Sequence, residues 1–180
     1  QFRDSEYVVV PSGSCAATIR VFYLELFADD PGLLAEATAL ASKTYEFSEF
    51  LVNVLKVEDA SACGARHQGS VTYHPSCHLL RELGIKTEPL KLLSSVPGLE
   101  KKELEGAEIC CGFGGTFSVK FPHISEGMVS DKIANVQASG ASTLVACDMS
   151  CLMNMGGALN RQGSAIKVRH LAQILDSDSD

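Results

Sequence analysis

The feature that constrains this chain most is the grouping of five of its seven cysteines. They form three clusters along the sequence: Cys77, the run Cys110-Cys111-Gly112, and the pair Cys147 and Cys151. Two adjacent thiolates can reach one metal centre, and glycine allows backbone N–H groups to come close to the sulfurs. A disulfide framework fits poorly, because adjacent cysteines pair badly with each other. The pattern therefore indicates a soft metal centre.

The composition favours metal or redox chemistry over binding to polyanions. A net charge of −7 argues against nucleic acid and against anionic membrane surfaces as partners. An odd number of cysteines in an acidic chain indicates a reducing compartment. No apolar run approaches the ~18–20 residues of a membrane span, so we expect no transmembrane segment.

Strand and helix signals alternate along the chain. Short β-rich runs are predicted at 7–10, 71–74, 91–96, 143–146 and 166–168, with helical segments between them. Such alternation predicts an α/β fold with mainly parallel sheets flanked by helices. Because each cysteine cluster follows a strand, the clusters are expected to meet at the carboxyl ends of the strands, where ligands bind in open α/β sheets.

Three other segments carry specific expectations. The stretch 45–55 is predicted to be one amphipathic helix whose apolar residues face the core. These residues are Phe47, Phe50, Leu51, Val54 and Leu55. The stretch 100–105 is predicted to be a charged, solvated surface segment, and the acidic tail 176–180 is expected to be disordered.

Several single residues are open to more than one interpretation. His74 and His78 flank Cys77; either could ligate a metal, but a hydrogen bond to a cluster sulfur or to the backbone is favoured. Cys15 opens a predicted helix, where it is equally well interpreted as a stabilised thiolate or as a small buried residue. Cys63 has no cysteine partner at ligand spacing and is expected to be an incidental thiol.

An internal repeat is suggested by two stretches with the same pattern. Residues 8–15 can be laid on residues 144–151, since both read strand, turn, Ser-Cys, helix. On this alignment, residues 1–62 are the C-terminal part of a first cysteine-rich module that is truncated at its N-terminus, and 63–180 are a complete second module. Cys15 is then the remnant of the first module. The alignment also matches Cys147 to Pro11, which weakens Cys147 as an obligatory ligand.

The cysteine motifs resemble the cysteine-rich CCG domain of heterodisulfide reductases and related iron–sulfur oxidoreductases. Within this group, the chain resembles the lactate utilization protein A family through residues 7–15, 45–51, 71–85, 110–117 and 151–157. The family pattern is a cysteine, thirty-odd residues, Cys-Cys-Gly, thirty-odd residues, then Cys-x-x-Cys. Here 32 residues separate Cys77 from Cys110, and 35 separate Cys111 from Cys147. The closing element departs from the pattern, because it reads Cys147-x-x-x-Cys151 with Asp148 three residues before the last cysteine.

The resemblance implies an iron–sulfur cluster, of the [4Fe-4S] type, held by Cys77, Cys110, Cys111 and Cys151. A five-cysteine, non-cubane cluster would need Cys147 as well. The resemblance also implies an oxidoreductase subunit that transfers electrons in a cytoplasmic complex oxidising L-lactate to pyruvate. Its partners would be other iron–sulfur and accessory subunits. No nucleotide-binding glycine fingerprint follows the first strand, so catalysis is expected to be shared with those partners.

Two alternatives use the same cysteines without an iron–sulfur cluster. Four thiolates also bind Zn²⁺ tetrahedrally, which would make the chain a structural or interaction module. Direct thiol–disulfide chemistry at Cys110 and Cys111, as in a heterodisulfide reductase-like redox protein, would need no metal. Metal analysis and visible absorption of anaerobically purified protein separate these alternatives.

Overall fold

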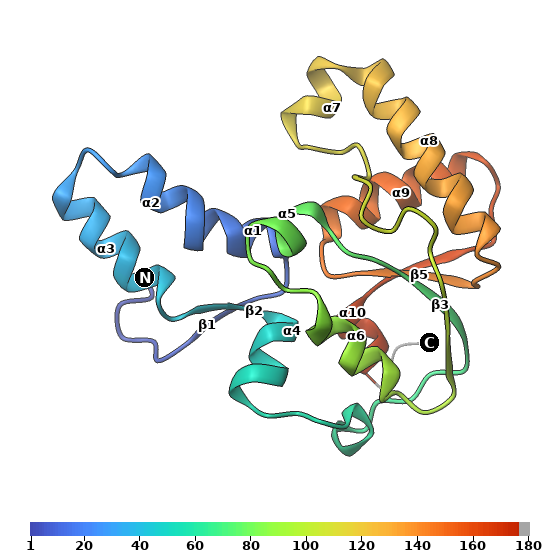
Figure 1. Cartoon of the computed structure of the whole chain (residues 1–180), viewed down its shortest axis with the longest axis horizontal. Helices are drawn as coiled ribbons and strands as arrows, with labels where there is room; N and C mark the ends of the chain where they lie inside the picture. Colours follow the sequence, from blue (N-terminus) through green and yellow to red (C-terminus); the bar gives the residue numbers. More distant parts are fainter. Residues whose placement is uncertain (177–180) are drawn as a thin grey trace.

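The computed structural model describes residues 1–176, so the rest of the acidic tail, 177–180, lies outside the described residues. Two parallel sheets flanked by helices confirm the α/β prediction (Figure 1). The smaller sheet pairs β1 (Val8–Val10) with β2 (Thr44–Glu46). The larger has the order β4 (Leu99–Lys102), β3 (Gly69–His74), β5 (Thr143–Ala146), β6 (Lys167–His170).

The centre of the larger sheet is β3 paired with β5. All four residues of β5 are buried, as expected for a parallel strand covered on both faces. The parallel register runs from Val71 opposite Thr143 to His74 opposite Ala146. The two strands therefore end side by side, and the loops that lead to Cys77 and Cys151 start from neighbouring points.

Helices cover both faces of this sheet. On one face, α8 (Pro122–Ala138) and α9 (Met149–Arg161) pack on Leu144 and Ala146. On the other, α6 (Thr87–Ser94) and α10 (Leu171–Leu175) pack on Val145. The alternation follows from the pleat, since neighbouring residues of a strand point to opposite faces. Short helices α5 (Cys77–Arg81) and α7 (Thr116–Lys120) lie above the strand ends.

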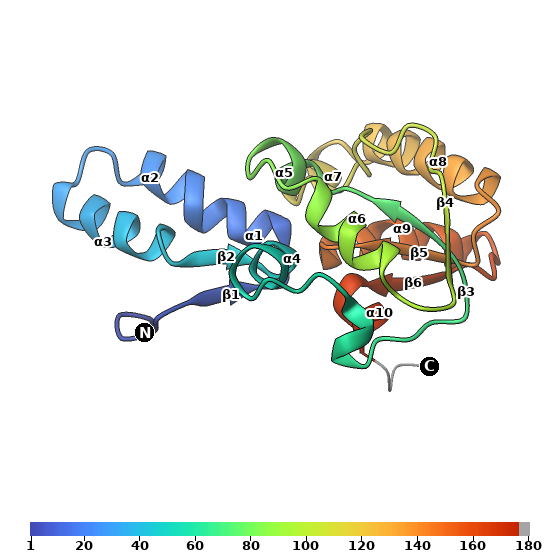
Figure 2. The ribbon, with the colours of Figure 1, turned by 60° about the horizontal axis from the view of Figure 1, so that its bottom comes forward.

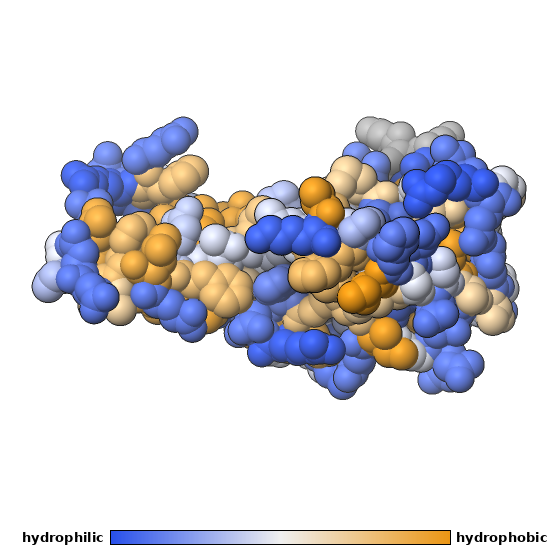
Figure 3. Space-filling model, turned by 90° about the horizontal axis from the view of Figure 1, so that it is seen from above, coloured by the Kyte–Doolittle hydropathy of each residue, from blue (hydrophilic) through white to orange (hydrophobic). Residues whose placement is uncertain are grey.

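The N-terminal arm, residues 1–46, extends away from the larger sheet (Figures 1 and 2). It contains a continuous helical run made of α1 (Gly13–Ala17), a π-helical turn (Thr18–Phe22) and α2 (Tyr23–Leu26). Helix α3 (Pro31–Ala41) folds back along this run. Figure 3 shows the arm as the narrower part of the molecule, with hydrophobic side chains along its surface. Within residues 1–176, no helix is long and apolar enough to span a membrane.

The prediction of one helix over 45–55 is wrong at its start and in its burial. Strand β2 occupies Thr44–Glu46, followed by α4 (Phe47–Glu49) and a π-helical turn (Phe50–Val54). Of the five apolar residues assigned to the core, four are half-buried and Leu55 is exposed. A three-residue strand shows no periodicity, and β2 exists because β1 pairs with it.

Next to the larger sheet, one prediction is wrong, and another is right about surface exposure but missed a strand. The stretch 91–96 lies mostly in helix α6, with Leu92, Leu93 and Val96 buried at helical spacing, and is not a strand. The charged stretch after it contains strand β4, with Glu100 and Lys101 exposed. Strand β4 lies at the edge of the sheet, where charged side chains are common because they discourage further strand pairing. Because the sequence of β4 is polar, its pattern did not predict a strand.

Candidate metal centre

The centre is built where β3 and β5 end. Strand β3 ends at His74, and α5 begins at Cys77 after the buried N-cap residue Ser76. Strand β5 ends at Ala146, and Cys151 is the third residue of α9. Since the two strands are paired and parallel, the loops that follow β3 and β5 start at the same end of the sheet.

The Cys-Cys-Gly loop is held in place by α8 and α9. Gly112 has a φ of +83°, and a Cβ there would lie 2.8 Å from both the Met128 Cβ and the Ser125 carbonyl oxygen. Only glycine fits this close approach. The Ser125 hydroxyl donates to the Gly112 carbonyl at 2.8 Å, and the Asn154 amide donates to the Cys111 carbonyl at 2.9 Å. Both helices therefore fix the loop backbone that carries the two adjacent cysteines.

Four cysteines from three segments meet in this place. Hydrogen bonding from the Cys111 and Cys77 thiols lowers the pKa of Cys110, with the Gly112 N–H, 3.4 Å from its sulfur, acting in the same direction. Hydrogen bonding to Cys110 and to Cys151 raises the pKa of Cys111. Without a metal, these sulfurs form a chain that stabilises a thiolate at Cys110. Gathered soft donors of this kind suit zinc or an iron–sulfur cluster.

His74 lies among these sulfurs, fully buried. One ligand atom each from His74, Cys111 and Cys151 lies within 4.8 Å of the other two. Neither ring nitrogen has a hydrogen-bond partner in the described part of the chain. Burial, together with the charge of Lys132, lowers the pKa of His74 to about 4. The imidazole is therefore neutral at pH 7, the form that binds metals.

Lys132 is a buried cation beside the centre, only 1% exposed. Its ammonium donates to the carbonyls of Gly106 at 2.6 Å and Ala107 at 3.1 Å, in the segment that leads into the Cys-Cys-Gly loop. Burial lowers the pKa of Lys132, while the charges of Cys111, Cys110, Cys77 and Cys151 raise it. Sequence reasoning missed Lys132. The available signal was its position among Val129, Ile133 and Val136, a stripe at helical spacing that is otherwise apolar.

Cys147 points to the other face of the sheet. It packs with the α6 and α10 side, and the Tyr73 hydroxyl donates to its sulfur at 3.6 Å. Burial raises the pKa of Cys147, and the charge of Glu46 raises it further. The structure therefore places Cys147 apart from the four gathered cysteines.

The two remaining cysteines are exposed and lie outside the centre. Cys15 is the third residue of α1, and Cys63 ends a short 3₁₀ helix (Ala60–Cys63). His78, on the other side of Cys77 from His74, is also exposed and packs edge to face with Phe22 at 5.7 Å. All three residues are exposed, whereas the gathered cysteines are buried or half-buried.

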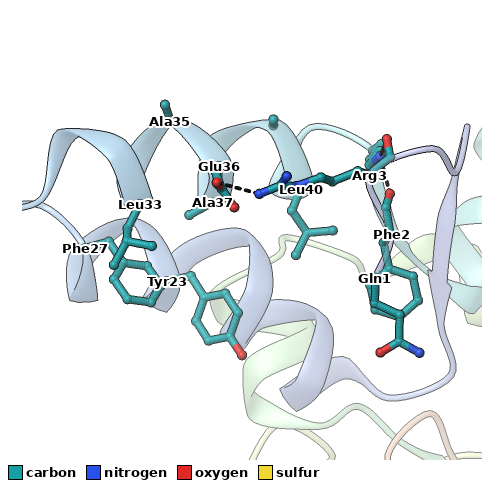
Figure 4. A pocket seen from close by; sticks show the side chains of 12 residues that line it. Gln1, Phe2, Arg3, Tyr23, Phe27, Leu33, Ala35, Glu36, Ala37 and Leu40 are labelled. Atoms are coloured by element: carbon teal, nitrogen blue, oxygen red, sulfur yellow. Dashed lines mark hydrogen bonds and ion pairs between the residues drawn. The ribbon is translucent and has the colours of Figure 1, made fainter.

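A cavity lies elsewhere, in the N-terminal arm (Figure 4). It has a volume of about 590 Å³ and lies between α2, α3 and residues 1–3. Its walls include Tyr23, Phe27 and Leu40, and the Arg3–Glu36 ion pair, 2.8 Å long, crosses its rim. Within residues 1–176, no cysteine lines this cavity. It is therefore separate from the candidate metal centre.

Comparison with known proteins identifies a cysteine-rich domain within the chain and relatives that match nearly its whole length. The family model of the cysteine-rich domain matches residues 71–156, which include the four gathered cysteines. Lactate utilization protein A of Shouchella clausii is 53% identical over 98% of this chain and 72% of its own length. Lactate utilization protein A of Bacillus subtilis is 52% identical over the same shares, and that of Bacillus cytotoxicus 49% identical over 99% and 73%. With such identity over nearly its whole length, the chain belongs to the lactate utilization protein A family.

Proposed function

We propose that the gathered cysteines hold an iron–sulfur cluster and that the chain is an electron-transferring oxidoreductase subunit. The observation that carries the proposal is the convergence of Cys77, Cys110, Cys111 and Cys151, which come from three separate segments of the chain. Four thiolates are the ligand set of a [4Fe-4S] cluster. When bound, such a cluster supplies one-electron transfer.

The chain's own residues would hold and tune that centre. The four thiolates are the ligands, and the Gly112 N–H points at the Cys110 sulfur. Lys132 adds a buried positive charge that favours the negative charge of thiolates and of the group they hold. Hydrogen bonds to sulfur, nearby charge and burial are the means by which proteins set cluster potentials.

The biological role we propose is lactate utilization, because the relatives carry that name. In its finer form, the proposal is that the chain serves a complex oxidising L-lactate to pyruvate, together with other iron–sulfur and accessory subunits. Catalysis would then be shared with those partners. Seven free cysteines suit a reducing compartment, which is the basis for proposing a cytoplasmic location.

We also propose the two-module division at residues 62 and 63. Support comes from two matching sets of elements: β1, α1, β2, α4 in the first module and β5, α9, β6, α10 in the second. In each set the two strands are parallel and directly paired. In each set the last helix opens with a capping box, at Glu46 and at His170.

Zinc is the second candidate, favoured by one specific observation. His74, Cys111 and Cys151 have ligand atoms within 4.8 Å of one another, and a mixed Cys/His set is common in structural zinc sites. The third candidate is metal-free thiol–disulfide chemistry, favoured by the lowered pKa of Cys110 beside Cys111. A thiolate next to a second thiol is the arrangement such exchange requires.

The deciding experiment is anaerobic purification followed by iron, zinc and sulfide analysis, visible absorption and electron paramagnetic resonance. The proposal expects a brown protein with iron and acid-labile sulfide. A colourless protein with one zinc per chain supports the zinc module, and a colourless, metal-free protein with redox-active thiols supports the third candidate. As a second arm, Lys132→Met should lower the midpoint potential of a cluster, whereas Lys120→Met, which changes an exposed lysine, should not.

A further inference from the structure

We infer that His74 is a direct ligand of the metal bound at this centre, together with Cys111 and Cys151. The inference rests on the proposed function only for the kind of metal, because the same imidazole could ligate an iron of a cluster or a zinc ion. It adds a fifth protein donor, a nitrogen, to the four proposed thiolates, so that one iron of a four-iron cluster would carry two protein ligands.

The first argument is the unmet bonding capacity of the imidazole. His74 is fully buried, and neither of its ring nitrogens makes a hydrogen bond within the described residues. A neutral imidazole has one donor and one acceptor nitrogen, and burying them without partners costs the desolvation of both. The carbonyl of Ala107 lies near the ring and accepts from Lys132 at 3.1 Å; its second lone pair can accept the N–H of one ring nitrogen at most, which leaves the lone pair of the other nitrogen free. A bound metal would take the lone pair that the protein leaves free.

The second argument is position. His74 is the last residue of β3, opposite Ala146 in the sheet, so its backbone is fixed by two strands. Tyr73 packs with the α6 and α10 side, so by alternation His74 points to the face that carries α8 and α9. Cys111 and Cys151 lie on that same face, and the three ligand atoms are within 4.8 Å of one another. A single metal ion can span such a separation between its ligands.

The other histidines near the centre show what a non-ligating histidine looks like here. His78 is exposed and packs on Phe22. His170 uses its Nδ1 to accept the Ala172 N–H at 3.1 Å, as the N-cap of α10. Each of these two histidines makes an ordinary structural contact. His74 differs from both in having two buried nitrogens, unpartnered within residues 1–176, beside a group of thiols.

The test is pulsed electron paramagnetic resonance on anaerobically reconstituted, reduced protein, with natural-abundance and ¹⁵N-histidine-labelled samples compared. A directly bound imidazole gives a strong nitrogen hyperfine coupling that changes with the isotope. His74→Gln should abolish that coupling, and His78→Gln should leave it unchanged. A wild-type cluster without a strong isotope-sensitive nitrogen coupling would overturn the inference. Because that observation uses the wild-type protein, it does not depend on whether His74→Gln folds.

A second measurement separates this inference from the proposed function. If the wild-type protein takes zinc and no iron, the iron–sulfur proposal fails, but His74 can still be tested by X-ray absorption at the zinc edge. Ligation predicts a nitrogen shell at about 2.0 Å beside sulfurs at about 2.3 Å, and a purely sulfur shell would contradict it. His74→Cys should retain the metal in either case while replacing the nitrogen signal with sulfur. Retention of the nitrogen signal in His74→Cys would assign it to another residue and overturn the inference.

Discussion

The β1–α1 turn and the β5–α9 turn are built alike, yet only one of them contributes to the centre. Each joins a strand to a helix, with the N-cap residue Ser12 in one and Asp148 in the other. A cysteine is the third residue of each helix. Cys15 is exposed, whereas Cys151 is 7% exposed and lies beside Cys111. A strand–turn–Cys–helix motif therefore makes a site only where other loops end next to it.

The two turns also contact each other at equivalent positions. The Asp148 carboxylate accepts from the Ser12 hydroxyl at 3.4 Å and from the Ser14 N–H at 2.8 Å, while capping its own helix at the Ser150 N–H at 3.1 Å. Contact between equivalent residues is what an approximate internal twofold would produce. One carboxylate thus serves the first turns of α1 and α9, but of the two cysteines only Cys151 is buried, with its sulfur within 4.8 Å of the Cys111 sulfur.

The largest expected effect is on metal content. Substituting the cysteine of the β5–α9 turn should remove the metal, whereas substituting the cysteine of the β1–α1 turn should not. Cys151→Ser should reduce bound metal to below about a tenth of the wild-type content, since even changes outside the ligand shell cost 10–100-fold in affinity. Cys15→Ser, the matched change in the other turn, should leave it unchanged, as should Cys63→Ser. Metal analysis after anaerobic reconstitution measures all three. Full metal content in Cys151→Ser, or loss of metal in Cys15→Ser, would contradict the claim that only the β5–α9 turn contributes to the centre.

The two N-caps should differ in their contribution to stability. Ser12→Ala removes one cap and should cost about 1 kcal/mol of unfolding free energy. Asp148→Ala removes the cap of α9 and also leaves the Ser14 N–H without its acceptor, so we expect about 2–3 kcal/mol. Urea unfolding of the metal-free variants measures both. Equal costs would mean that Asp148 does not link the two turns.

The residues that open the capping boxes of α4 and α10, Glu46 and His170, should show opposite pH dependence. Burial raises the pKa of Glu46 above 4.5, so its contribution to stability is complete below that value and is lost as pH rises through the folded-state pKa. Burial lowers the pKa of His170 below 6.5, so its contribution is present above that value and is lost as pH falls.

Two variants separate these contributions in unfolding measurements between about pH 4 and 8. Relative to wild type, Glu46→Gln should gain stability as pH rises above 4.5, because the variant has no buried charge to form. His170→Gln should gain relative stability as pH falls below 6.5. Slopes of the same sign for both variants would contradict the assignment of these two pKa shifts.

The smallest effect is on thiol reactivity. In the metal-free protein, Cys15 and Cys63 should be alkylated before Cys151, because both are exposed and Cys151 is buried. Quantitative mass spectrometry of timed samples gives the order. Labelling of Cys151 as early as Cys15 would show that the centre opens without its metal, and the contrast between the two turns would then depend on the bound group.

The sequence alone determined the ligand candidates and the class of fold. Cysteines after predicted strands, at family spacing, identified Cys77, Cys110, Cys111 and Cys151, and the alternation of strands and helices predicted parallel sheets. The periodic signals were strong where elements are long or buried, as in α8 and β5. They failed at β2 and β4, because a three-residue strand has no period and an edge strand is as polar as a loop.

The tertiary structure decided which side chains reach the centre. Cys147 directly follows Ala146, yet the two pack on opposite faces of the sheet, because successive strand residues alternate in direction. The same alternation turns His74 toward the thiols and Tyr73 away from them. A shift of one residue in the strand register would reverse both assignments. Lys132 likewise looks in the sequence like part of an ordinary helix face, and only the packing of α8 against the Cys-Cys-Gly loop brings its charge to the sulfurs.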